Sequence, residues 1–85
     1  MKHATASALD KLEPLLVKLR RHGALKEKSR GVFYFKSRAI LHFHEDPEGL
    51  FADFRAAADW QRFGANTAVE RAALLRAVSE FLVPR

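Results

Sequence analysis

Apolar and polar residues alternate on either side of a strong turn signal, and this pattern constrains the fold more than any other feature. Residues 39–44, Ala-Ile-Leu-His-Phe-His, and residues 50–55, Leu-Phe-Ala-Asp-Phe-Arg, flank Asp46-Pro47-Glu48-Gly49. Asp favours the first position of a type I turn, Pro presets the second, and Gly accepts the positive φ that follows. We therefore predict an antiparallel hairpin, preceded by a strand at Val32-Phe33-Tyr34-Phe35 and a connection at residues 36–38.

The register of these strands follows from which face collects the apolar side chains. If Glu45 lies opposite Leu50, the core face collects Phe33, Phe35, Ala39, Leu41, Phe43, Leu50, Ala52 and Phe54. The second face then collects Val32, Tyr34, Ile40, His42, His44, Phe51, Asp53 and Arg55. A bulge at Gly49 is the alternative, and it moves Asp53 and Arg55 beside the core phenylalanines. Because burying a charge is costly, we predict the first register.

Two amphipathic helices are predicted, one before and one after the strands in the sequence. Leucines recur at spacings of three and four from Leu9 to Leu19. Thr67-Ala68-Val69-Glu70 forms a capping box before a second apolar stripe at 74–82. Pro14 predicts a kink in the first helix, and Pro84 predicts the end of the last one.

Together these elements predict a single α+β domain over residues 1–85, of order α-β-β-β-α. Both helices are expected to pack on one face of a three-stranded antiparallel meander. Apolar residues make up 48% of the chain and charged residues 29%, which excludes a disordered charged tail. The pattern leaves helix, strand and loop open for residues 56–66.

His42 and His44 form a His-x-His pair on one strand, so both imidazoles share one face, with Asp53 across from His42. Two imidazoles and a carboxylate are ligands that zinc and iron accept. The pattern indicates a candidate divalent metal site at His42, His44 and Asp53. The alternative is a structural role for Asp53. It would then pair with Arg55, or accept a hydrogen bond from His42 and favour the protonated imidazole. Apart from this candidate metal, no cofactor is predicted.

A basic segment leads into the first strands. Between Lys18 and Arg38 the chain holds eight basic residues and one acidic residue, within a net charge of +5. Basic groups around an aromatic ring can hold phosphates and stack a base. The candidate nucleic-acid-binding residues are Lys26, Lys28, Arg30, Tyr34, Lys36 and Arg38. Because no helix-turn-helix, RNP or GXXG pattern accompanies them, a solvated basic rim is the alternative.

Apolar side chains on the second face of the sheet indicate a partner. The patch consists of Val32, Tyr34, Ile40 and Phe51, and it is too apolar to leave in water. We expect a second copy of the chain to cover it in a homodimer or larger homo-oligomer. Trp60 and Phe63 folding over the patch, or a small ligand, are the alternatives.

One sequence pattern runs through the two central strands and their turn. Residues 38–53 read R-x-x-L-H-F-H-x-D-P-x-G-L-F-A-D. This pattern, with Arg62, Thr67 and Glu70 further along, resembles a family of small uncharacterised bacterial proteins. The first helix is only loosely similar to that family. The resemblance implies a compact α+β domain of bacterial origin, and it implies no activity.

The residue content disfavours several classes of function. The chain has no cysteine, which excludes a thiol nucleophile and a Cys-ligated metal site. Its serines lack a nucleophile-elbow context, and there is no glycine-rich phosphate loop. No apolar run reaches the ~18 residues of a membrane-spanning helix, and the first residues lack the apolar segment of a secretory signal.

We therefore expect a small basic, non-catalytic binding or interaction module of the bacterial cytoplasm, with no membrane partner. A nucleic-acid-associated protein that uses the basic segment is the second expectation. A metal- or small-ligand-binding module that uses the His-x-His pair is the third.

Overall fold

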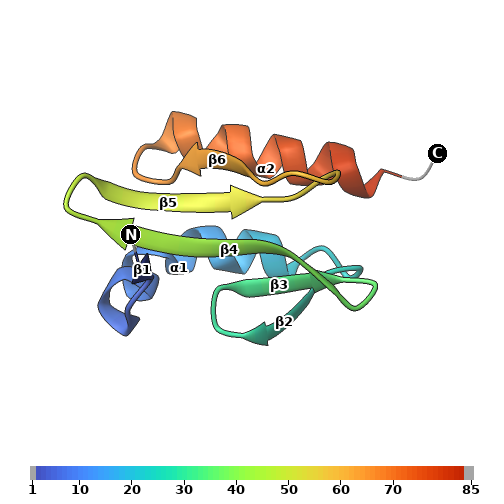
Figure 1. Ribbon diagram of the computed structural model, residues 1–85, viewed down its shortest axis with the longest axis horizontal. Helices are drawn as coiled ribbons and strands as arrows, with labels where there is room; N and C mark the ends of the chain where they lie inside the picture. Colours follow the sequence, from blue (N-terminus) through green and yellow to red (C-terminus); the bar gives the residue numbers. More distant parts are fainter. Residues whose placement is uncertain (1, 84–85) are drawn as a thin grey trace.

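The structure, a computed structural model, describes residues 2–83 (Figure 1). Within them the elements are β1 (Lys2–His3), α1 (Ala6–Arg20), β2 (Lys26–Ser29), β3 (Val32–Phe35), β4 (Arg38–Asp46), β5 (Gly49–Phe54), β6 (Gln61–Gly64) and α2 (Ala68–Leu82). The predicted α+β class is confirmed. Two helices flank strands β2 to β6 in the chain, as the apolar stripes predict, while β1 precedes the first helix.

The sheet has more strands than the alternation predicts. Five strands lie side by side in the order β2-β3-β4-β5-β6, and β1 pairs with β4 outside this row. The prediction of a three-stranded meander is therefore wrong in strand number. β2 has the sequence Lys-Glu-Lys-Ser, and β6 lies in the segment 56–66 that the pattern left open. Both are edge strands, which pair through their backbones and need no apolar alternation to do so.

The register between β4 and β5 is the predicted one. Glu45 lies opposite Leu50, and Asp46 lies opposite Gly49. The Glu48 backbone N–H donates to the Asp46 carboxylate (2.8 Å), and Gly49 has a φ of +140°. This side chain closes the turn, and glycine adopts the positive φ without the steric cost that other residues meet.

The connection between β3 and β4 differs from the prediction. Phe35 pairs with Arg38, so the turn contains only Lys36 and Ser37, which both have positive φ (50° and 68°). A bulge in β4 then restores the register, since Tyr34 pairs with Ala39 but Phe33 pairs with Leu41.

The extra residue of this bulge is Ile40, and its side chain is 2% exposed in the hydrophobic core. The prediction that Ile40 lies on the second face is therefore wrong. A bulge redirects the side chain it inserts. The same shift places Ala39 opposite Tyr34, so the prediction that Ala39 lies on the core face is also wrong.

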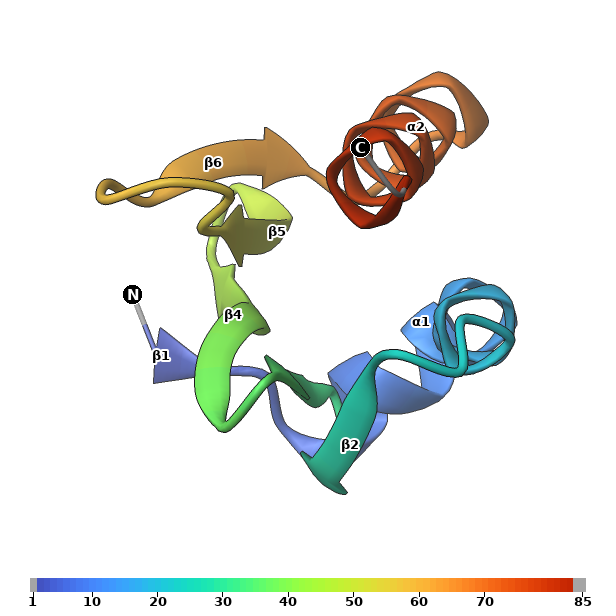
Figure 2. The ribbon, with the colours of Figure 1, turned by 90° about the vertical axis from the view of Figure 1, so that its right-hand side faces the viewer.

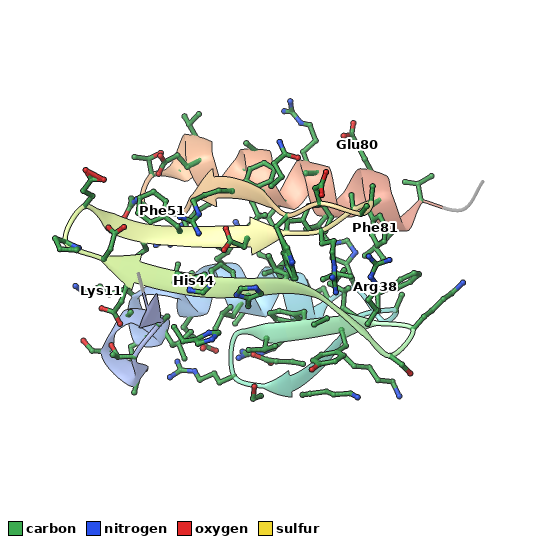
Figure 3. All side chains as sticks on the ribbon, viewed as in Figure 1. Lys11, Arg38, His44, Phe51, Glu80 and Phe81 are labelled. Carbon is green, nitrogen blue, oxygen red and sulfur yellow. The ribbon has the colours of Figure 1, made fainter. Side chains whose placement is uncertain are left out.

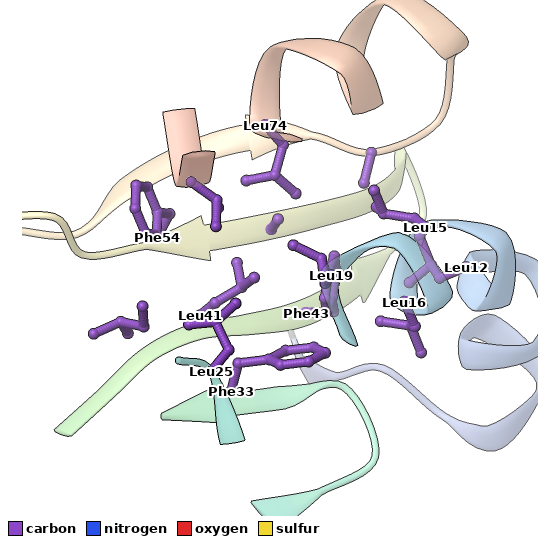
Figure 4. Close-up of a cluster of buried hydrophobic side chains, with 14 of the residues drawn as sticks. Leu12, Leu15, Leu16, Leu19, Leu25, Phe33, Leu41, Phe43, Phe54 and Leu74 are labelled. Carbon is purple, nitrogen blue, oxygen red and sulfur yellow. The ribbon is translucent and has the colours of Figure 1, made fainter. Parts of the chain in front are cut away.

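Both helices pack on the concave side of the curved sheet (Figure 2). The buried core includes Leu12, Leu16 and Leu19 of α1, Phe33, Ile40, Leu41, Phe43 and Phe54 of the strands, and Leu74 and Val78 of α2 (Figure 4). The predicted core residues Phe35 and Leu50 are partly buried and pack against this cluster. The core face predicted from the sequence is thus the face that the helices cover.

The helix ends follow the capping signals. Thr5 caps α1 by accepting a hydrogen bond from the Ala8 backbone N–H (3.4 Å), and Pro14 lies inside the helix. Thr67 and Glu70 form the predicted capping box of α2. Pro84 lies outside the described residues. Neither helix within residues 2–83 has the length and apolar character needed to cross a membrane.

Candidate metal centre

The face of the sheet opposite the helices carries the candidate site, and we call it the outer face. In Figure 3 the sheet lies in front of α1, with His44 labelled on β4 and Phe51 on β5. Strand register places on this face His3, Lys26, Tyr34, His42, His44, Phe51, Asp53 and Arg62. The His-x-His pair therefore lies on the surface that the sequence predicts for it.

Three imidazoles gather on the outer face, and we call them the histidine cluster: His3, His42 and His44. β1 brings His3 directly opposite His44, and the two rings stack with centroids 4.9 Å apart. The His42 ring lies 4.5 Å from that of His44 and 5.7 Å from that of His3. One ring nitrogen from each residue lies within 4.8 Å of the other two. This separation is wider than that of ligands that share one ion, but it lies within the reach of side-chain rotation.

His3 is the ligand-type residue that the sequence analysis missed. It lies 39 positions before His42 in the printed sequence, in a two-residue strand. His3 stands two positions before Thr5, the residue that caps α1, and this local context does not indicate a metal ligand. The pairing of β1 with β4 is a long-range contact that no short pattern predicts.

Two nitrogens of the cluster lack hydrogen-bond partners. The Nδ1 atoms of His42 and His44 are buried and accept or donate no hydrogen bond among the described residues. Burial lowers the pKa of His42, and the neighbouring His44 lowers it further, because both disfavour a charged imidazole. His42 is thus held as a neutral imidazole, which is the form that binds metal ions.

Asp53 lies opposite His42 in the strand register, but its carboxylate contacts the diagonal neighbour. Its Oδ2 lies 3.2 Å from Nε2 of His44. Arg62 of β6 donates two hydrogen bonds to the same carboxylate, at 2.8 and 3.0 Å. These bonds lower the pKa of Asp53 and keep it ionised. The Asp53 carboxylate therefore contacts His44 and Arg62, and not His42 as one structural alternative predicted.

Trp60 covers the other side of His42. The two rings are 4.6 Å apart and edge-to-face, and the Arg55 guanidinium lies 4.5 Å from the Trp60 ring centre. Phe63, by contrast, lies opposite Ala52 and packs on the core side. Only Trp60 of the two predicted residues therefore folds over the outer face.

The apolar patch predicted for a homo-oligomer is smaller than expected. Ile40 belongs to the core, as described above, while Val32, Tyr34 and Phe51 are partly exposed. The Lys28 ammonium lies 4.5 Å from the Tyr34 ring centre, and the Arg62 guanidinium lies 5.9 Å from that of Phe51. Cations of the same chain thus cover part of this surface. Association through it stays a prediction.

Two arginines of the basic segment form ion pairs within the protein, whereas its lysines form none with residues 2–83. Arg20 binds Glu13 and Glu27, and Arg30 binds Asp10 and Glu13. Arg38 donates to the Ala57 carbonyl oxygen (3.2 Å). The predicted nucleic-acid residues Lys26, Lys28, Tyr34 and Lys36 line one concavity. Arg30 and Arg38 do not line it, so the structure brings only four of the six predicted residues together.

Glu27 makes an acid-sensitive contribution to stability. It accepts two hydrogen bonds from Arg20 and one from the Gly31 backbone, which lower its pKa below the ordinary 4.5. A carboxyl with a lowered folded-state pKa stabilises fully above its ordinary pKa, and this contribution disappears as pH falls through the lowered value. Glu27→Gln is expected to lose about 1–2 kcal/mol at pH 7.

Urea unfolding of both proteins between pH 7 and pH 2 measures this contribution. The difference in unfolding free energy is expected to shrink below pH 4.5, because protonated Glu27 resembles glutamine. A difference that stays constant over this range would show that the charge of Glu27 contributes nothing.

Comparison with known proteins gives no further information on the site. No protein-family profile, curated protein or solved structure matches this chain. The resemblance to small bacterial proteins therefore stays a prediction.

Proposed function

We propose that this protein is a small binding module for a divalent transition metal, held by the histidine cluster. The observation that carries the proposal is the approach of three imidazole nitrogens to within 4.8 Å of one another. Nitrogen ligands at ~2.0–2.1 Å from a tetrahedral zinc ion lie roughly 3.3 Å from one another. Side-chain rotations that shorten the present separations by about 1.5 Å would let the three nitrogens bind one ion. Imidazole suits zinc, copper and nickel.

The carboxylate beside the cluster supports this assignment, since Oδ2 of Asp53 lies 3.2 Å from Nε2 of His44. A metal-binding histidine commonly donates its other ring N–H to a carboxylate, which fixes the tautomer and the ring orientation. Asp53 is placed to accept such a bond from Nε2 of His44, which leaves Nδ1 for the metal. We therefore assign Asp53 an orienting role and not that of a ligand.

A metal in the histidine cluster would join β1 to β4. β1 has only two residues and pairs with β4 at Lys2–Glu45 and His3–His44. An ion held by His3 and His44 together adds a cross-link to this short pairing. Three protein ligands also leave a fourth coordination position for water or another donor.

Quenching of Trp60 fluorescence tests the proposal. Trp60 is the only tryptophan of the chain, and its ring centre is 4.6 Å from that of His42. Titration of the tag-free protein with Ni²⁺ or Cu²⁺ is expected to quench the emission with a stoichiometry of one ion per chain. Zn²⁺ is expected to compete with the quenching ion. It is also expected to raise the melting temperature, since a free Zn²⁺ concentration of 100 times Kd adds about 2.7 kcal/mol to the free energy of unfolding.

The four histidines of the chain supply a matched control. Each of the three cluster histidines is expected to be essential for metal affinity. His3→Ala, His42→Ala and His44→Ala should each weaken binding by more than about 10–100-fold, which is the loss typical when a residue that only orients a ligand is replaced. His22→Ala removes the one histidine outside the cluster, which lies near Ser79 of α2, and is expected to bind like the wild type. Unchanged quenching in the three cluster variants would overturn the proposal.

A further inference from the structure

A second candidate site lies on the hairpin of β2 and β3, and it shares no residue with the histidine cluster. Lys26, Lys28, Tyr34 and Lys36, with Ala24 and Ser37, line a concavity of about 260 Å³. We call the three lysines and Tyr34 the basic hairpin face. From it we propose a separate property of the protein: the basic hairpin face binds single-stranded nucleic acid.

The charge of this face is not neutralised by the protein itself. The two arginines of the segment with acidic partners, Arg20 and Arg30, hold Glu13, Glu27 and Asp10. Within residues 2–83, no carboxylate forms an ion pair with any of the three lysines. The acidic residue between two of them, Glu27, lies opposite the core residue Phe33 and turns to Arg20. Three ammonium groups are thus left for an external polyanion.

The spacing of the lysines suits a chain of phosphates. Lys26 and Lys28 are two residues apart in β2, about 7 Å along the strand, and Lys36 stands at the turn after β3. An extended backbone with successive phosphates can contact each of them in turn.

Tyr34 distinguishes nucleic acid from other polyanions. Its ring lies opposite Lys26 in the strand register, and the Lys28 ammonium is 4.5 Å from its centre. An aromatic ring among basic groups on a sheet surface is the arrangement on which proteins stack the bases of single strands. A paired duplex does not offer its base faces, so the ring favours an unpaired strand. When Lys28 moves to a phosphate, the ring face that it covers becomes open to a base.

Fluorescence anisotropy with a labelled ten-nucleotide oligothymidylate tests this proposal, using tag-free protein without added metal. Three phosphate contacts on a single strand predict a salt slope of about −2, so affinity should fall about 20-fold between 50 and 200 mM salt. The double variant Lys26→Glu/Lys28→Glu is expected to lose binding. Arg76→Glu, at an exposed position of α2, is expected to keep it within about two-fold, because surface charges far from a site contribute little.

Substitutions of Tyr34 separate stacking from charge. Tyr34→Ala is expected to weaken binding by about 5- to 150-fold, the loss that corresponds to one stacked base. Tyr34→Phe keeps the ring and is expected to bind like the wild type. Circular dichroism establishes that each variant is folded.

Two results would overturn the proposal. One is wild-type affinity in the lysine double variant. The other is equal affinity of the wild-type protein for oligothymidylate and for a polyglutamate of the same charge, which would show that an acidic peptide satisfies the face. Neither result depends on the histidine cluster, so this proposal and the metal proposal fail separately.

Discussion

Phe43→Ala is expected to lower the free energy of unfolding by about 3–5 kcal/mol. Phe43 is 2% exposed and lies in the core between the sheet and the helices. The loss combines the transfer free energy of the ring with the cavity that remains, because the surrounding leucines close only part of it. At about 0.05–0.15 kcal/mol per residue, a chain of 85 residues has roughly 4–13 kcal/mol of stability in total. The expected loss is therefore a large part of the total stability, and the variant should melt at a much lower temperature than the wild type.

Tyr34→Ala on the opposite face is the control for this prediction. Tyr34 is partly exposed on the outer face under Lys28, so its loss is expected to be about 1 kcal/mol or less. Urea unfolding of the three proteins compares their midpoints and slopes. Equal losses for Phe43→Ala and Tyr34→Ala would mean that the outer face is also a buried face, covered by a partner chain.

Asp53→Asn is expected to weaken metal binding by about 10–100-fold, although Asp53 is not assigned as a ligand. The carboxylate accepts two hydrogen bonds from Arg62 and lies 3.2 Å from Nε2 of His44. Asparagine keeps the size of the side chain but loses the charge and one acceptor oxygen. The His44 ring then loses the partner that selects its tautomer, and the nearby Arg62 charge is no longer balanced.

Calorimetric titration with Zn²⁺ measures this effect, and Glu48→Gln provides a control. Glu48 is an exposed acidic residue in the turn between β4 and β5, so its variant removes the same charge without touching the cluster. Zinc affinity within about two-fold of the wild type is expected for Glu48→Gln, since exposed charges are screened. The same small loss in Asp53→Asn would contradict the orienting role, and complete loss would favour Asp53 as a direct ligand.

The central part of the fold could be predicted from the sequence because its signals are local. The turn at residues 46–49 and the alternation around it determine the register, and the register places His42 and His44 on the outer face with Asp53. Burial supplies the reason, because the other register would place Asp53 and Arg55 in the core. The capping box at residues 67–70 is local in the same sense.

The edge strands, the position of Ile40 and two residues of the site could not be predicted, because they depend on contacts that no local sequence pattern marks. β2 and β6 are polar edge strands that form because a neighbouring strand offers its backbone. Ile40 is in the core because Lys36 and Ser37 form a shorter turn, at two residues that carry no glycine or asparagine signal. His3 joins the site through β1, and Arg62 reaches Asp53 through β6. The third imidazole and the partner of the carboxylate were therefore beyond sequence reasoning.

Anomalous X-ray diffraction at the zinc edge tests the central claim most directly, using crystals of the tag-free protein grown with one equivalent of Zn²⁺. We expect one zinc peak per chain, at ~2.0–2.1 Å from a nitrogen of each of His3, His42 and His44. Asp53 is expected to bind Arg62 and His44 and not the ion. No peak at this position, or a zinc ion held instead by the acidic turn at Asp46 and Glu48, would contradict the account.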